Sequence, residues 1–397
     1  MLLATAALGS ASAGSAQGSQ PNIVMIIGDD LGWYDTAIYN PNSPSRNIAM
    51  VAQEGMILDR HYVFRYCSPT RRAFLTGRFP NHITSVQPDG DNMCSDFTPL
   101  ATEIVSEKLS RAGYRCHFVG KGHLGYETTD HLPINRGFES HVGYLGGSQS
   151  YEWGGGSKNA TKGKHDMWHD HGPGTDIVPE LFYSANFYTA RAVDIIAKHP
   201  IAEAPLFLYL PYQNVHSPDT LPPTWETRNF PAFGPKELHV YANMIHMLDQ
   251  GVLNVSAALK TRPGMWDATL VVFCADNGGI GNYGNNYPLR GHKHDPWEGG
   301  TRVAAFISGG FVPDVLRGTH SGDKLVHIAD WYATFCALAG VDATDSPVIG
   351  GKARPIDGVN VWPLLTGQTT TAPRRITPTT EVSIIDVGAC LLFTVTF

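Results

Sequence analysis

The feature that most constrains the fold is a set of three short apolar segments, each followed at once by polar side chains. The segments span 22–27, 205–210 and 269–274. Continuous apolar runs of this length are typical of strands buried on both faces of a parallel sheet. Because the carboxyl ends of parallel strands lie at one edge, the polar residues that follow them should gather in a single crevice.

Helical patterns lie between these segments, over 99–112, 184–198 and 236–259. Alternation of strand and helix predicts an α/β fold, with a large, mixed, mostly parallel sheet sandwiched by helices. The 397 residues exceed what a single core usually holds, about 250–300 residues. We therefore expect one large domain and a smaller appendage.

The charge and hydropathy of the chain exclude two classes of partner. Its net charge of -7 argues against the basic surface that nucleic-acid binding requires. No apolar stretch reaches the length of a membrane span. We predict a protein that binds no nucleic acid and does not cross a membrane.

Residues 1–19 read as a signal peptide or as a disordered tail. An apolar run is followed by small residues that suit signal-peptidase cleavage, but no Lys or Arg precedes it. Two glycosylation sequons begin at Asn159 and Asn254. These features predict a glycoprotein of the secretory pathway, either secreted or held in a lysosome-like compartment.

Two pairs of oxygen-bearing side chains follow the first and third apolar segments. They are Asp29 with Asp30, and Asp276 with Asn277. Either pair alone would be an ordinary cap or loop feature. Two pairs at the ends of buried strands instead predict a site for a hard cation, Ca²⁺ in preference to softer metals.

The segment 67–78, with the sequence Cys-Ser-Pro-Thr-Arg-Arg-Ala-Phe-Leu-Thr-Gly-Arg, is the most informative in the chain. Alone, Cys67 would be a buried thiol at the start of a helix. One further motif precedes it, Asp-Asp at 29–30, and four follow in order: Gly-Lys-Gly-His-Leu-Gly at 120–125, Val-His-Ser-Pro at 215–218, Ala-Asp-Asn-Gly-Gly at 275–279, and Arg-Gly-His-Lys at 290–293 with Trp-Glu-Gly-Gly at 297–300.

From about residue 21 to residue 365 the chain resembles the type I, formylglycine-dependent sulfatases, and is most similar to the arylsulfatase B branch. Thr70, where the family often has Ser, is a mild departure. The resemblance implies an alkaline-phosphatase-like sulfatase fold and a sulfuric ester hydrolase of the arylsulfatase type. It also implies that a formylglycine-generating enzyme converts Cys67 to formylglycine during maturation. One Ca²⁺ would then be held by Asp29, Asp30, Asp276, Asn277 and the modified residue 67.

The resemblance further implies a mechanism. The hydrate of the modified Cys67 attacks sulfur, with Asp276 assisting its deprotonation. His216, with Lys293 nearby, protonates the departing oxygen. His123 then removes a proton from the second hydroxyl, so that sulfate is expelled and the aldehyde is restored.

Fixed positive charge is also required where sulfate leaves. The resemblance places Arg71 on the aldehyde hydrate and Lys121 on a sulfate oxygen. The substrate would be an aryl sulfate or a sulfated sugar, with N-acetylgalactosamine 4-sulfate at the end of a glycosaminoglycan as the family-level expectation. Its specificity residues would lie in a long loop over 143–174; the alternative is that this loop is a mobile surface segment without a role.

Two other functions stay open. One is a phosphatase or phosphonate hydrolase, which would favour two metals about 4 Å apart. The other is an inactive, secreted binding protein, because the C-terminus departs from the family. We divide the chain into a catalytic domain over 20–366 and a remnant or aberrant segment over 367–397. Pairing among Cys94, Cys116, Cys274, Cys336 and Cys390 stays open.

Overall fold

The computed structural model describes residues 20–83, 97–152, 166–174, 177–178, 183–224, 226–230, 236–378, 383–386 and 391–394. The predicted leader or tail over 1–19 and the sequon at Asn159 lie outside these residues, as do Cys94 and Cys390. Within the described ranges Cys67, Cys116, Cys274 and Cys336 are free and buried.

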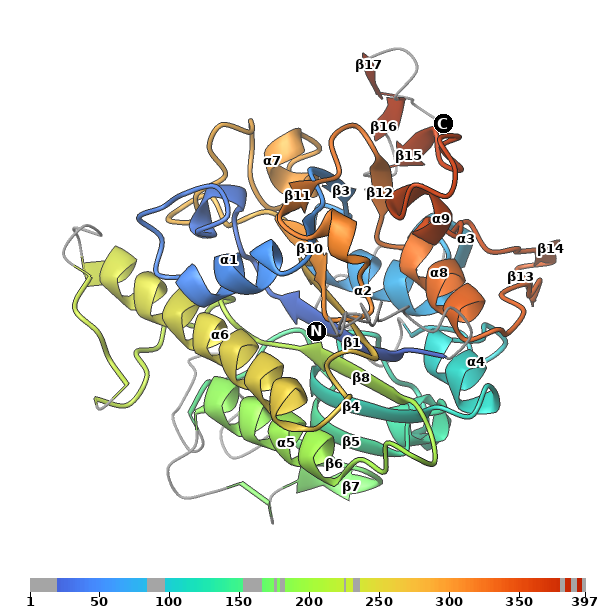
Figure 1. Ribbon diagram of the computed structural model, residues 1–397, viewed down its shortest axis with the longest axis horizontal. Helices are drawn as coiled ribbons and strands as arrows, with labels where there is room; N and C mark the ends of the chain where they lie inside the picture. Colours follow the sequence, from blue (N-terminus) through green and yellow to red (C-terminus); the bar gives the residue numbers. More distant parts are fainter. Residues whose placement is uncertain are drawn as a thin grey trace, which may run out of the picture.

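A ten-stranded sheet forms the centre of the molecule (Figure 1). Its strands, in spatial order, are β11 (Thr319–His320), β2 (Met56–Ile57), β10 (Ala305–Ser308), β9 (Thr269–Ala275), β1 (Asn22–Gly28), β8 (Leu206–Pro211), β4 (Arg115–Lys121), β5 (Ser140–Tyr144), β6 (Trp168–His169) and β7 (Gly172–Pro173). The five strands from β9 to β5 are mutually parallel. Antiparallel strands β10, β6 and β7 extend the two sides.

Helices cover both faces of this sheet (Figure 1). One layer contains α1 (Arg46–Gln53), α5 (Ser184–Lys198) and α6 (Lys236–Thr261), which pack on one another. The other contains α2 (Cys67–Thr76), α4 (Val105–Arg111) and α8 (Asp330–Leu338). Short helices α3 (Pro80–Ile83), α7 (Glu298–Thr301) and α9 (Trp362–Leu365) complete the set. None of the helices in the described ranges combines the length and apolar character that a membrane span requires.

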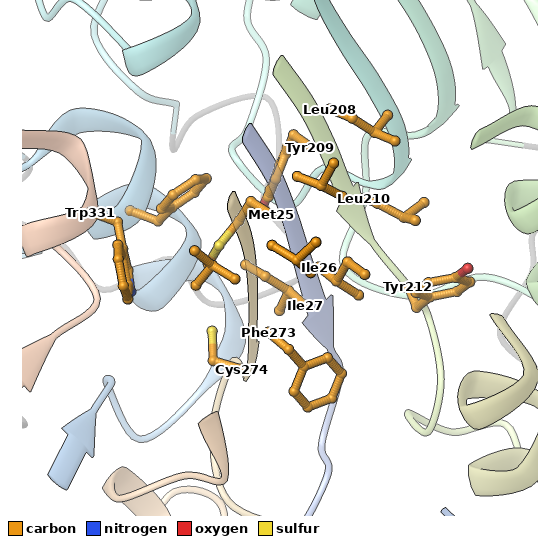
Figure 2. Packing of buried hydrophobic residues seen from close by; sticks show 14 of the residues in the cluster. Met25, Ile26, Ile27, Leu208, Tyr209, Leu210, Tyr212, Phe273, Cys274 and Trp331 are labelled. Carbon is orange, nitrogen blue, oxygen red and sulfur yellow. The ribbon is translucent and has the colours of Figure 1, made fainter. Parts of the chain in front are cut away.

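The core explains why the site lies where it does. Every residue of β1 is buried, and Figure 2 shows its side chains packed with those of β8 and β9. Gly28 pairs with Ala275, and Ile27 pairs with Pro211. Three parallel strands therefore end at the same level, so the polar residues that follow them emerge together.

Smaller sheets flank the main one. They pair β3 (Arg60–Tyr62) with β12 (Leu325–His327), and β13 (Val348–Ile349) with β14 (Lys352–Ala353). Near the C-terminus, β15 (Ile376–Pro378), β16 (Ser383–Asp386) and β17 (Leu391–Thr394) form an antiparallel sheet. The division of the chain at residue 366 stays a prediction.

The predicted fold class is confirmed, and the helix over 184–198 has the expected bounds. Two local expectations were wrong. The helix predicted over 99–112 begins at Val105, because Ile104 is extended and its amide donates to the Glu107 carboxylate. The predicted loop over 143–174 contains β6 and β7, since two-residue edge strands leave no periodicity in a sequence.

Candidate active site

The polar residues after β1 and β9 meet at the carboxyl edge of the sheet. The amide of Asp30 donates to the Asp276 carboxylate at 3.2 Å, and the side-chain amide of Asn277 donates to Asp30 Oδ1 at 2.8 Å. Asp30 has a φ of 60°, a left-handed conformation that turns the chain sharply after the strand. Asp29, Asp30, Asp276 and Asn277 are all buried.

Cys67 is the first residue of α2 and lies directly against these carboxylates. Its Sγ is 3.4 Å from Asp29 Oδ1 and 4.0 Å from Asp30 Oδ1. All ten residues of α2 are buried, so the helix penetrates the domain and carries Cys67 to the strand ends. The positive end of the helix dipole therefore faces the site, which favours an anion there.

Three cations surround the carboxylates. Lys121, at the end of β4, places Nζ 2.6 Å from Asp29 Oδ2. Lys293 contacts both oxygens of Asp30, at 2.7 and 2.9 Å. Arg71 donates to Asp276 Oδ2 through Nε at 3.0 Å and a terminal nitrogen at 2.7 Å.

The ion pairs shift the pKa values of the site in different directions. Burial alone would raise the pKa of Asp29, but the charges of Lys121 and His216 outweigh burial, and the pKa is lowered. The pKa of Asp30 is also lowered, because Lys293 and His216 outweigh burial. Burial, followed by the charge of Asp29, raises the pKa of Asp276 to about 6. The site therefore holds two firmly ionised carboxylates beside a third that is close to accepting a proton.

Two histidines, His216 and His123, lie close to the charged groups of the site. His216 has its Nδ1 2.7 Å from the carbonyl of Ser217 and its Nε2 3.8 Å from Asp30 Oδ2. His123 is buried, and neither of its ring nitrogens has a hydrogen-bond partner in the described part of the chain. Its pKa is lowered well below the usual value, first by burial and then by Lys121.

The donor set fits a hard divalent cation. Four residues each bring one possible ligand atom to within 4.8 Å of the others: Asp29, Asp30, Cys67 and His216. Asn277 Oδ1 is buried without a partner among the described residues, although the amide nitrogen of the same side chain is bonded. A buried acceptor of this kind costs free energy unless something satisfies it, and an oxygen-preferring cation would do so.

Gly120 shapes the sheet edge between Lys121 and the neighbouring strand. Its φ is 127°, and a Cβ there would lie 2.0 Å from the carbonyl oxygen of Pro211. A side chain at this position would push β4 away from β8. Glycine therefore allows the close packing of β4 on β8 that lets Lys121 reach Asp29, two strands away.

A pocket of about 420 Å³ opens over Asp30, His216 and Lys293. All the catalytic and metal residues predicted from the sequence lie at this one edge, but the roles assigned to them stay predictions. Sequence reasoning missed other residues of the pocket wall, namely Ser217, Ile280, Gly281, Asn282, His292 and His294. Ser217 and His292 stand in the motifs at 215–218 and 290–293, where they were given no role, and proximity to Lys293 could have identified His294.

Known proteins with similar sequences match most of this chain. Arylsulfatase J of Mus musculus is 33% identical over 355 residues, which cover 88% of this chain and 56% of that protein. N-acetylgalactosamine-6-sulfatase of Mus musculus is 29% identical, over 93% of this chain and 70% of its own length. The chain thus spans little more than half of the first of these relatives.

Solved structures of other proteins have a similar fold. The crystal structure of Ps i-CgsB in complex with k-i-k-neocarrahexaose has a TM-score of 0.79 and 29% identity, covering 93% of this chain and 82% of that one. The PsFucS1 sulfatase from Pseudoalteromonas sp. has a TM-score of 0.71 at 22% identity, over 94% and 77% of the two chains. The family model described as Sulfatase matches residues 21–341, and this chain therefore belongs to the sulfatase family.

Proposed function

We propose that this protein hydrolyses sulfate esters. One observation carries the proposal: Cys67 is buried at a helix N-terminus, against two ionised carboxylates, with three cations around them and a pocket above. Such a site can bind a tetrahedral anion and stabilise the charge that develops as it is cleaved.

Residue 67 would act as formylglycine, produced by a formylglycine-generating enzyme. Burial and the charge of Asp276 raise the pKa of the Cys67 thiol, so its reactive thiolate is disfavoured at neutral pH. An unmodified thiol is therefore a poor nucleophile here. The aldehyde hydrate of formylglycine would supply a hydroxyl nucleophile at the same place.

The carboxylates would hold one divalent cation, Ca²⁺ on the chemistry of the donor set. When bound, it supplies positive charge that polarises oxygen near sulfur. Asp29, Asp30, Asp276 and Asn277 would be its protein ligands. Lys121 and Arg71 would keep the surrounding charge fixed, so that little reorganisation is needed as the sulfate leaves.

Proton transfer to the leaving group falls to His216. A carbonyl can only accept, so Nδ1 carries one proton toward Ser217, and the acid step requires the imidazolium form, with a second proton on Nε2 facing Asp30 and the pocket. Burial lowers the pKa of His216, and the charge of Asp30 opposes that shift. Lys293 lines the same pocket and would support the acid step. His123, whose lowered pKa keeps it neutral, would accept the proton that lets sulfate depart.

Phosphate-ester hydrolysis is less well supported. It would favour two metals about 4 Å apart with additional His and Asp ligands. In the described ranges, the His, Cys, Asp and Glu side chains able to share an ion form a single group at Asp29, Asp30, Cys67 and His216.

The pocket favours a sulfated sugar as substrate over a purely aromatic one. Its lining is mostly polar, with His292, His294 and Asn282 beside one aliphatic residue, Ile280. The hydroxyl groups of a sugar could hydrogen-bond to these side chains. N-acetylgalactosamine sulfates are the first candidates. The sequon at Asn254, exposed on α6, supports a route through the secretory pathway to a secreted or lysosome-like location.

The test uses protein co-expressed with a formylglycine-generating enzyme. Mass spectrometry of the peptide containing residue 67 should give the mass of formylglycine. We expect turnover of 4-nitrophenyl sulfate and of N-acetylgalactosamine 4- or 6-sulfate, lost in Cys67→Ala and reduced by a chelator. Absence of turnover from protein that carries formylglycine would favour the inactive binding protein, and faster turnover of the phosphate ester would favour a phosphatase.

A further inference from the structure

The segment 145–151, which follows β5, contacts both histidines of the site. The amide of His123 donates to the carbonyl of Leu145 at 3.0 Å. A Cβ on Gly147 would lie 2.7 Å from the imidazole ring of His123. The segment therefore packs against the ring itself, at a position where only glycine fits.

Tyr151 connects the same segment to His216. Its side chain is fully buried, and its hydroxyl is 2.8 Å from the carbonyl of Gln213 and 2.8 Å from the carbonyl of His216. Both carbonyls can only accept, so the hydroxyl shares its single proton between them. Burial raises the pKa of Tyr151 far above its usual value, so this donor keeps its proton.

Other contacts hold Tyr151 rigid and join the two segments. Its ring stacks on Tyr183 with centroids 5.3 Å apart, and its carbonyl accepts from the amide of Ser184 at 2.9 Å. Ser148 donates to the carbonyl of Ser217 at 3.2 Å, directly beside His216. The first turn of α5 thus supports Tyr151, and Tyr151 supports the backbone that carries His216.

We propose that Tyr151 is a positioning residue for His216. By fixing the carbonyls at both ends of the turn over 213–216, its hydroxyl sets the direction of the imidazole ring relative to the pocket. This inference rests on the proposed function, in which His216 protonates the leaving oxygen. General acids act only within hydrogen-bond reach, and a displacement of about 1 Å can cost about 100-fold in rate.

Leaving-group dependence distinguishes this role from a merely structural one. Phenyl sulfate needs an acid, whereas 4-nitrophenyl sulfate releases an anion that is stable without one. In the formylglycine-bearing protein, Tyr151→Phe should lower kcat/KM by about 10- to 100-fold for phenyl sulfate and by less than about 3-fold for 4-nitrophenyl sulfate. Tyr114→Phe is the matched control, because its buried hydroxyl donates to the carbonyl of Pro21 at 2.8 Å, outside the turn over 213–216.

A double-mutant cycle tests whether the effect passes through His216. In the His216→Ala background, adding Tyr151→Phe should change kcat/KM by less than about 2-fold, since the positioned group is already absent. Equal losses on both substrates, no loss on either, or additive losses in the cycle would overturn the inference. Each of these outcomes requires an active parent protein. An inactive parent carrying formylglycine would instead refute the proposed function, and the inference with it.

Discussion

Two buried arginine–aspartate pairs differ in what surrounds them. Arg71 and Asp276 are fully buried at the sheet edge, and Arg374 and Asp330 are buried at the start of α8. Arg374 donates to both oxygens of Asp330 at 2.6–3.0 Å. Asp330 also accepts from two backbone amides, and Arg374 donates to two backbone carbonyls. That pair belongs to a closed network of hydrogen bonds.

The pair at the sheet edge is also hydrogen-bonded, but other charged side chains crowd it. Arg71 is also 3.7 Å from Asp29, and burial together with that carboxylate raises the pKa of Asp276 to about 6. Burial would lower the pKa of Arg71, but Asp276 and Asp29 raise it well above its usual value. Crowded carboxylates suit a site that binds a cation, whereas an isolated pair saturated by backbone hydrogen bonds suits a structural role.

The largest effect should come from the structural pair. Arg374→Met leaves Asp330 buried without its charge partner and frees the carbonyls of Asp357 and Ile376. We expect a loss of about 3–5 kcal/mol in the free energy of unfolding. Urea denaturation measures it. The kcat/KM of the folded fraction should not change. A loss of activity at normal stability would contradict the structural role of the Arg374–Asp330 pair.

The second effect belongs to catalysis. Arg71→Met should lower kcat/KM for sulfate esters by about 10²–10³, because fixed positive charge beside the leaving sulfate is removed. The stability cost should be smaller than for Arg374→Met, since Asp276 already has a raised pKa of about 6 and can take up a proton. Arg71→Lys keeps the charge and should be less impaired. If Arg71→Met unfolds the protein while the remaining folded fraction keeps its kcat/KM, Arg71 has a structural role like that of Arg374.

The sequence identified both residues of the first pair as site residues, without predicting that they pair, and singled out neither residue of the second. Arg71 and Asp276 each lie in a local motif beside a buried strand or helix start, so their patterns are readable in the chain. Arg374 follows a Thr- and Pro-rich stretch with no periodicity, and its partner lies 44 residues away. Contacts between loops depend on tertiary packing, which local patterns do not encode.

The same limit applies within the site. The sequence correctly predicted that Asp29 and Asp276 lie at one edge of the sheet. Both follow continuous apolar runs typical of parallel strands, whose carboxyl ends meet at a single edge. Tyr151 was not identifiable, since its contact with His216 joins segments 65 residues apart. It lies in the stretch whose role the sequence left open, and side-chain identity alone gave no reason to single it out.

A third effect should come from the cation. At a free Ca²⁺ concentration about 100 times its dissociation constant, the free energy of unfolding should rise by about 2.7 kcal/mol. Arg374→Met should keep this increment, because its network lies away from the proposed ligands. Asp29→Asn should lose most of it. Thermal unfolding with Ca²⁺ and with EDTA gives the measurement, and an undiminished increment in Asp29→Asn would place the cation elsewhere.

The smallest expected effect concerns how the free energy of unfolding depends on pH. Here a buried histidine and the carboxylate of a charged pair should act in opposite directions. His141 is fully buried, and burial, followed by the charge of His169, lowers its pKa to about 3. As the pH falls below about 6.5, His141 is protonated in the unfolded chain but stays neutral in the folded protein. The free energy of unfolding therefore decreases as the pH falls. Asp276 acts in the opposite direction, because its raised pKa makes the folded state gain stability as the pH falls toward 6 and below.

His141→Leu removes the imidazole while keeping an apolar contact for Phe118, whose ring centroid lies 4.8 Å from that of His141. Between pH 8 and pH 5 the variant should lose about 2 kcal/mol less stability than the parent. The difference at pH 8, where imidazoles are neutral in both states, reports packing alone and serves as the internal control. Parallel pH profiles for the two proteins would mean that the acid sensitivity arises from other groups, the two arginine–aspartate pairs among them.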